Sequence, residues 1–140
     1  ILTSGMRRTE QTLQLLFGDL PHDQDIRFRE ICFGDFELHT YDQLKDNPAY
    51  QQWIRDDGQT PPPGGESFPQ FRQRVLDGLR ELSQQEEPTV LVTHGGVIAL
   101  IMDHLFPKEE KNRYQWQPQP GGGYKITNDY YEKLEPLERS

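Results

Sequence analysis

The 140-residue sequence lacks three features that would each define a class of protein. It has a single cysteine, Cys32, which excludes an internal disulfide framework and predicts a location in the reducing cytoplasm. It has no apolar run near the roughly 18–20 residues that span a membrane, and no recognisable signal peptide. It has no basic excess either, since its net charge is −8. We therefore expect a protein that binds neither membranes nor nucleic acid.

The length and an apolar content of 33% fit one domain, which we expect to span residues 1–140. Residues 1–3 resemble the end of a strand, and residues 90–92 form a short apolar run typical of a strand in a parallel sheet. Apolar residues at helical spacing follow each of these two segments, and the same spacing recurs after Ser67. The sequence therefore predicts an α/β fold, a three-layer sandwich with a mostly parallel sheet and helices on both faces.

His94 stands where the strand at residues 90–92 ends and a helix begins. Gly95 and Gly96 follow it, and apolar residues at helical spacing continue until Pro107. In open α/β sheets this carboxyl edge is where ligands bind, and a helix N-terminus there offers free N–H groups to an anion. A second interpretation stays open, in which a backbone carbonyl satisfies His94 at an ordinary turn.

A second candidate site follows the first strand. Ser4 is expected to cap a helix that ends at Gly18, which places Arg7 and Arg8 in its first turn. Cations at a helix N-terminus oppose the macrodipole, so the pair is better explained if an anion is shared with the helix end. Arg8 is the stronger candidate for that role, whereas Arg7 is interpreted as a surface residue.

Residues 28–37 combine carboxylates with aromatic and apolar residues in a segment too irregular for a helix. Such surroundings favour the protonated form of a carboxyl group, so Glu30 and Glu37 are candidates for a general acid. Alternatively, both are surface carboxylates beside a partly buried aromatic cluster. Cys32 has no downstream arginine at the spacing of a thiol phosphatase loop, and we interpret it as a core residue.

Local signals define the remaining elements. We expect a turn at residues 20–23, an extended piece at 26–28, short helices on either side of Pro48, and a loop from 56 to 65. Residues 124–134 are expected to form a hairpin. No cluster of cysteine or histidine has the spacing of a metal site.

Four segments together resemble a known family. They are Ser-Gly-Met-Arg-Arg-Thr-Glu-Gln-Thr at 4–12, Arg-Glu-Ile-Cys-Phe-Gly-Asp-Phe-Glu at 29–37, Gly-Gly-Glu-Ser at 64–67 and Thr-His-Gly-Gly at 93–96. In this order they resemble the histidine phosphatase (phosphoglycerate-mutase-like) superfamily. The segments at 33–37 and 63–67 look most like the small bacterial phosphatases, including α-ribazole phosphatases. Gly5 stands where proline is common in the family, and Leu38 stands where a glycine often follows the equivalent of Glu37.

The resemblance implies a mechanism. In the family a histidine attacks phosphorus and carries the phosphoryl group, a carboxylate protonates the leaving alkoxide, and water then releases phosphate. Matched by motif, Arg8 binds phosphate and Glu30 is the proton donor. His94 stabilises the transferring phosphoryl oxygens, and the Gly95 N–H is a further donor. Such chemistry rests on positioning and electrostatic stabilisation, and the resemblance implies neither a metal nor a cofactor.

The family's Arg-His-Gly motif, which carries the nucleophile on a central strand beside that of His94, does not occur in the sequence. His22, His39 and His104 do not replace it, since none is followed by glycine after an apolar strand. We therefore expect an N-terminally incomplete histidine phosphatase domain whose intact form hydrolyses a small phosphorylated metabolite. Two alternatives stay open: an inactive pseudoenzyme that binds phosphate esters, and a phosphoglycerate mutase. The identity of the ester and the formation of a homodimer are also left open.

Overall fold

The computed structural model describes residues 1–136, and the chain divides into two compact units. The first unit contains residues 1–29 and the chain from Glu87 onward, and the second runs from Glu30 to Glu86. The expectation of a single domain over residues 1–140 stays a prediction. Within the described part of the chain, no helix has both the length and the apolar character needed to cross a membrane.

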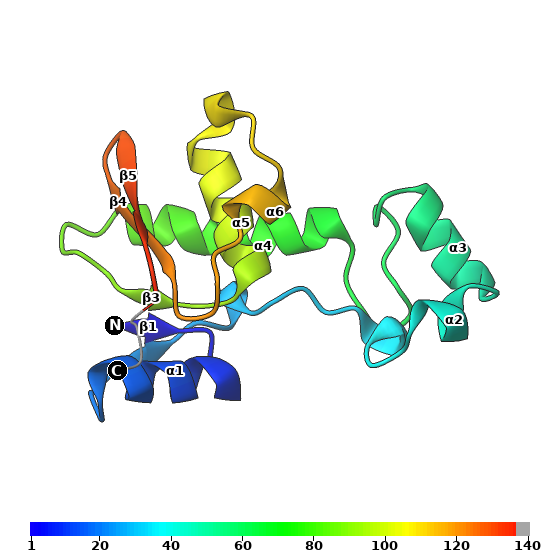
Figure 1. Ribbon diagram of the computed structural model, residues 1–140, viewed down its shortest axis with the longest axis horizontal. Helices are drawn as coiled ribbons and strands as arrows, with labels where there is room; N and C mark the ends of the chain where they lie inside the picture. The colour runs from blue at the N-terminus through cyan, green and yellow to red at the C-terminus, as the bar shows by residue number, and fades with distance from the viewer. Residues whose placement is uncertain (137–140) are drawn as a thin grey trace. The chain divides into compact units, whose positions relative to one another are not determined.

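The first unit contains a parallel sheet of three short strands (Figure 1). β1 (Leu2–Thr3) lies between β2 (Asp23–Gln24) and β3 (Leu91–Val92), and both pairings are parallel. The expected α/β class with a parallel sheet is thus confirmed. β3 pairs with β1 on one edge, and no other strand in residues 1–136 pairs with its second edge.

Two helices lie on opposite sides of these strands (Figure 1). α1 (Arg7–Phe17) ends at Gly18, whose φ of 78° is a conformation that glycine adopts without strain. α5 (Gly95–Leu105) follows β3 directly and is the most apolar helix of the unit. Its buried residues are Val97, Ala99, Ile101 and Met102.

The C-terminal part of the first unit surrounds one buried tryptophan. Its elements are a 3-10 helix at Pro107–Glu109, α6 (Arg113–Trp116), β4 (Gly123–Thr127) and β5 (Tyr130–Leu134). Trp116 is fully buried, and the rings of Tyr124 and Tyr131 lie 5.9 and 5.3 Å from it. β4 and β5 form the expected antiparallel hairpin, with Asn128 at φ 47° in its turn.

The segment between α1 and the second unit differs from the expected turn and extended piece. Asp23–Gln24 forms β2, and a 3-10 helix follows at Ile26–Phe28. The carboxylate of Asp25 accepts the Arg27 N–H at 3.0 Å, which starts the helical turn, and Phe28 is fully buried. The expected turn was wrong at Asp23 because β2 forms by pairing with β1. That strand is distant in the sequence, so local residue types do not reveal the pairing.

The second unit is built from helices. A 3-10 helix at Gly34–Phe36 precedes α2 (Tyr41–Leu44), α3 (Pro48–Arg55) and α4 (Phe68–Ser83). Ser67 caps α4: its Oγ accepts the Gln70 N–H at 3.2 Å, and the Gln70 side chain accepts the Ser67 N–H at 2.8 Å. The expected helices around Pro48 and after Ser67 are confirmed, and residues 56–65 contain neither helix nor strand.

Candidate active site

His94 joins the end of β3 to the start of α5, as the sequence predicts. It has extended backbone angles, with φ −117° and ψ 156°, and only 7% of its surface is exposed. Its Nε2 lies 2.9 Å from the Oγ of Ser4, at the carboxyl end of β1. The imidazole is therefore held by a side chain from the neighbouring strand, at the edge where ligands of α/β sheets bind.

Ser4 is a fully buried hydroxyl, and it does not cap α1 as expected. Met6 is the residue before the helix, while the Ser4 Oγ accepts the Met6 N–H at 3.3 Å and lies 3.1 Å from Thr9 Oγ1. The Thr9 hydroxyl gives its single proton to the Met6 carbonyl at 2.7 Å, so Ser4 donates to Thr9. Ser4 must then accept from His94, whose Nε2 carries a proton.

Three arginines lie near Ser4, either in the sequence or in the structure. Arg7 and Arg8 are exposed in the first turn of α1, as expected, and neither has an acidic partner among the described residues. Arg29 was missed by sequence reasoning, and its Nε donates to the Ser4 carbonyl oxygen at 3.3 Å. Arg8 thus lies within the Ser4 motif, and Arg29 contacts the backbone of that motif from a later segment.

A second polar network fixes the backbone at the start of the Ser4 motif. The Thr3 hydroxyl accepts the Gly5 N–H at 3.1 Å and donates to Glu10 at 2.6 Å. Glu10 also accepts from Gln24 at 2.7 Å and pairs with His22 at 2.5 Å. The hydrogen bond from Thr3 is the main cause that lowers the pKa of Glu10. The hydrogen bonds of His22 to the Leu20 carbonyl and then to Glu10 raise the pKa of this imidazole.

Gly95 is the first residue of α5, which is where the sequence predicts a backbone donor to phosphate. A Cβ built on it would lie 2.3 Å from the side-chain nitrogen of Gln117, so a larger residue would require the Gln117 side chain to move. Gln117 is a second residue that sequence reasoning missed. No signal in the sequence connects it to the Thr-His-Gly-Gly motif. The donor role of Gly95 stays a prediction.

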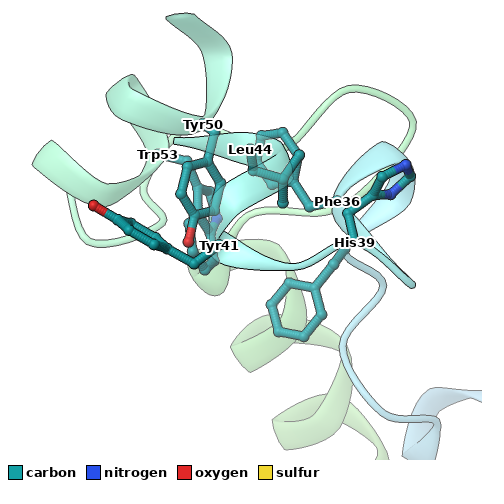
Figure 2. Close-up of a pocket in the computed structure, with 7 residues that line it drawn as sticks. Phe36, His39, Tyr41, Leu44, Tyr50 and Trp53 are labelled. Atoms are coloured by element: carbon teal, nitrogen blue, oxygen red, sulfur yellow. The ribbon is translucent and has the colours of Figure 1, made fainter. Parts of the chain in front are cut away.

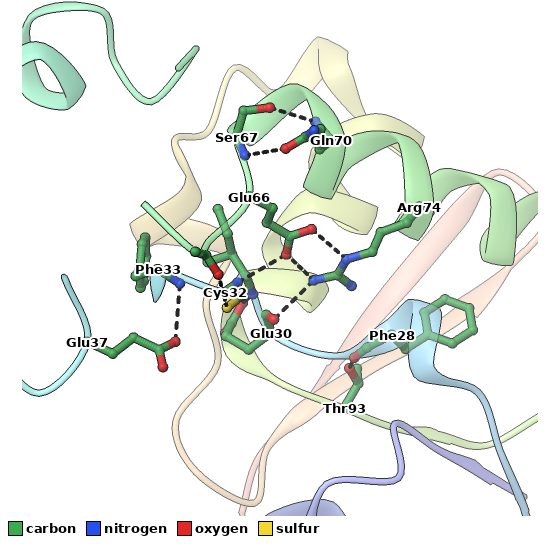
Figure 3. A network of polar contacts seen from close by, with 12 residues as sticks. Phe28, Glu30, Cys32, Phe33, Glu37, Glu66, Ser67, Gln70, Arg74 and Thr93 are labelled. Carbon is green, nitrogen blue, oxygen red and sulfur yellow. Dashed lines mark hydrogen bonds and ion pairs between the residues drawn. The ribbon is translucent and has the colours of Figure 1, made fainter. Parts of the chain in front are cut away.

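Glu30 belongs to the second unit, where a buried ion pair holds its backbone (Figure 3). Arg74 binds Glu66 through two nitrogens, at 2.5 and 3.0 Å, and donates to the Glu30 carbonyl oxygen at 3.0 Å. Glu66 in turn accepts the Cys32 N–H at 3.0 Å. The Glu30 carboxylate accepts the N–H of the next residue, Ile31, at 3.1 Å. The Gly-Gly-Glu-Ser motif thus supports the segment of Glu30.

Close backbone packing explains the glycines of the two motifs in this unit. A Cβ on Gly34 would lie 2.2 Å from the Pro63 carbonyl oxygen, and one on Gly65 would lie 2.7 Å from that of Cys32. Cys32 is exposed, so its interpretation as a core residue was wrong. The close packing in this part of the unit is between backbone atoms at Gly34 and Gly65 and does not involve burial of the Cys32 side chain. Glu37 accepts the Phe33 N–H at 3.1 Å across the 3-10 helix, which is a structural role.

The family model "Histidine phosphatase superfamily (branch 1)" matches residues 1–133. The chain belongs to this superfamily. Human 6-phosphofructo-2-kinase/fructose-2,6-bisphosphatase 4 is 30% identical over 110 residues, which cover 77% of this chain and 23% of that protein. Glucosyl-3-phosphoglycerate phosphatase from Mycolicibacterium vanbaalenii is 34% identical over 114 residues, which cover 72% of this chain and 50% of that protein. The chain therefore spans a quarter to a half of these curated relatives.

Solved histidine phosphatase structures share the fold. The α-ribazole phosphatase from Shigella flexneri has a TM-score of 0.77 and 27% identity, with 97% of this chain and 71% of that chain covered. A putative α-ribazole-5'-P phosphatase from Escherichia coli has a TM-score of 0.80 and 24% identity, with 99% and 72% covered. The expected resemblance to α-ribazole phosphatases is confirmed. Both comparisons include proteins that are named as phosphatases.

Proposed function

We propose that the intact protein hydrolyses small phosphomonoesters through a phosphohistidine intermediate, without a metal ion. The observation that carries this proposal is the buried His94–Ser4 pair at the junction of β3 and α5. An imidazole with a protonated Nε2 is fixed there beside a helix N-terminus, and Arg8 follows Ser4 on α1. Fixed donors and cations are what phosphoryl transfer requires, because its transition state spreads negative charge over the phosphoryl oxygens.

Each residue of the site has one role in this proposal. Arg8 binds the phosphoryl oxygens, and His94 with the Gly95 N–H stabilises their charge during transfer. When a histidine nitrogen bonds to phosphorus, the P–O bond to the alcohol breaks and Glu30 gives the leaving oxygen its proton. Water then attacks the phosphohistidine, Glu30 accepts a proton from that water, and phosphate leaves. The net charge of −8 of the whole sequence opposes the approach of an anion, so the attraction must come from local cations such as Arg8.

The nucleophile in this proposal is a histidine outside the 140 residues. His22 and His39 are held by the Leu20 and Glu37 carbonyls, and His104 lies in the last turn of α5. The edge of β3 that pairs with no strand in the described chain is where a further strand would bring a residue beside His94. A second candidate function is a module that binds phosphate esters without hydrolysing them.

The decisive experiment uses the product of the complete gene. Phosphate release from a panel of phosphomonoesters is measured with a chelator present, and the enzyme is quenched during turnover to detect acid-labile phosphohistidine. We expect release, labelling, and a loss of rate of about 10³-fold in His94→Asn. Ester binding without release or labelling would establish the binding module instead. Transfer of phosphate between two carbons of phosphoglycerate, in place of release, would establish a mutase.

Three further predictions belong to this proposal. The physiological ester is a small phosphorylated metabolite, and membranes and nucleic acid are not partners. We also propose a cytoplasmic location, on the basis of the single cysteine.

A further inference from the structure

The second unit contains a pocket that the phosphatase motifs do not use (Figure 2). Its volume is about 170 Å³. Most of its lining is aromatic, and the lining residues are Phe33, Phe36, His39, Tyr41, Leu44, Tyr50 and Trp53. Ligand sites of proteins are typically concave and mostly apolar, with a few polar atoms that fix orientation. This pocket has both properties.

The walls of the pocket are rings in mutual contact. Tyr50 and Trp53 are stacked at 5.9 Å with an angle of 24°, and Phe36 meets the Tyr50 ring edge-on at 5.3 Å. The outer side of Trp53 packs on Phe68, which starts α4, at 6.1 Å. Phe68 is itself held against Gly58, where a Cβ would lie 2.1 Å from the ring. The aromatic walls are therefore supported from behind and keep their spacing without a ligand.

Three polar atoms at the pocket are available to a ligand. The Nδ1 of His39 is 2.7 Å from the Glu37 carbonyl oxygen, so this nitrogen is the donor, and Nε2 of the neutral ring is an acceptor. Neither His39 Nε2 nor the hydroxyls of Tyr41 and Tyr50 have a hydrogen-bond partner among residues 1–136. Tyr41 and His39 lie on opposite sides of the pocket in Figure 2. The Tyr41 hydroxyl points away from His39 in this view, so His39 Nε2 is the polar atom that would orient a bound ring.

We infer that this pocket binds one aromatic or heteroaromatic ring that carries an N–H or O–H donor. The size fits one ring, since an apolar cavity of about 150 Å³ holds benzene. Aromatic walls favour a ring over an aliphatic group of equal size, because ring faces and edges attract each other. The donor of the ligand is bound by His39 Nε2.

Ring binding is tested without turnover, using indole as the probe and NMR spectra of the ¹⁵N-labelled full-length protein. We expect saturable shifts of the Trp53 indole resonance and its neighbours with indole, weaker shifts with 1-methylindole, which lacks the donor, and none with cyclohexanol. His39→Ala removes the acceptor and is expected to abolish the difference between indole and 1-methylindole. No saturable shift at these residues, or equal binding of cyclohexanol, would overturn the inference.

Two tyrosine variants distinguish the loss of one pocket residue from the loss of the folded structure. Tyr41 is 64% exposed, so Tyr41→Leu is expected to fold normally and to weaken indole binding several-fold. Tyr114→Leu is the matched control, because Tyr114 is 72% exposed on α6 and is not part of the pocket. Unchanged indole binding in Tyr41→Leu with native spectra would contradict the inference.

Discussion

At the scale of single residues, the Ser4 hydroxyl is the most constrained group of the candidate site. It is fully buried and contacts Met6 N, Thr9 Oγ1 and His94 Nε2. Ser4→Ala leaves the partly buried Met6 N–H and the buried His94 Nε2 without this partner. We expect the free energy of unfolding to fall by about 1–3 kcal/mol, as measured by urea denaturation.

The control for this prediction is Thr12→Ala. The Thr12 hydroxyl also bonds to the chain, through the Arg8 carbonyl, but it is exposed to water. Its removal should cost less than about 0.5 kcal/mol. Equal losses in Ser4→Ala and Thr12→Ala would mean that the buried hydroxyl does not hold the site together.

Leu38 shows the effect of backbone conformation at one position. Its φ is 62° and its side chain is fully exposed, so strain is not offset by burial. A residue with a Cβ loses about 1–2 kcal/mol in this region, whereas the flexibility of glycine costs about 0.5–1 kcal/mol. Leu38→Gly is therefore expected to raise the midpoint of thermal unfolding, with a gain of about 0.5–1 kcal/mol. Leu38→Ala keeps the Cβ, and a gain of the same size there would refute the strain.

The pair of His22 and Glu10 predicts a pH dependence of stability. The pKa of His22 is raised from 6.5 by the Leu20 carbonyl and then Glu10, so its charged form stabilises the fold. This contribution is complete below the ordinary pKa and is lost as the pH rises through the raised value. The pKa of Glu10 is lowered, mainly by Thr3, so its contribution is lost only as the pH falls through the lowered value.

The measurement compares the wild type with His22→Gln. We expect the difference in unfolding free energy to be larger at about pH 5.5 than at about pH 8.5. In a Glu10→Gln background that pH-dependent difference should become smaller but should not vanish, because the hydrogen bond of His22 to the Leu20 carbonyl remains. A difference that does not vary with pH would contradict the coupling of the two groups.

At the scale of elements, the ion pair of Arg74 and Glu66 connects α4 to the segment that carries Glu30. Both side chains are mostly buried, at 24% and 18% exposure, and Arg74 also reaches the Glu30 carbonyl. Arg74→Ala is expected to lower the free energy of unfolding by about 1.5–3 kcal/mol, because a charged hydrogen-bonded network loses its donor. Arg74→Lys should recover only part of this, since lysine cannot bind both carboxylate oxygens in the same fork.

Arg80→Ala is the matched control on the same helix. Arg80 pairs with Asp77 at 3.8 Å, and both side chains are exposed, at 70% and 42%. Such surface pairs contribute about 0–1 kcal/mol. If Arg74→Ala is no more destabilising than Arg80→Ala, the ion pair does not support the Glu30 segment.

The elements that sequence analysis predicted correctly carry their own local signals. Ser67 with Gln70 forms a capping box at α4, and Asn47 caps α3 just before Pro48. β2 was missed because two polar residues become a strand only by pairing with β1. The contact of Ser4 with His94 spans ninety positions of sequence, and the backbone of Cys32 packs closely against Gly65, which is thirty-three positions away. Such long-range contacts leave no periodic or compositional pattern.

At the scale of the whole molecule, an acidic protein is proposed to bind an anionic ester. The net charge of −8 opposes approach of phosphate, so affinity must come from the few cations that the fold places at the Ser4 motif. The sequence motif proposes Arg8 for this role, and the structure adds Arg29, which contacts the Ser4 carbonyl oxygen. Function at this scale therefore depends on local positive charge against an opposing background.

One paired measurement tests this account most directly, namely kcat/KM for a phosphomonoester in Arg8→Ala and in Arg7→Ala of the full-length protein. The two arginines are adjacent, exposed and in the same helical turn, so the variants change the net charge and the helix equally. We predict a loss of about 10²–10³-fold for Arg8→Ala and less than about threefold for Arg7→Ala. Equal losses, or no loss in either variant, would contradict the assignment of phosphate binding to Arg8.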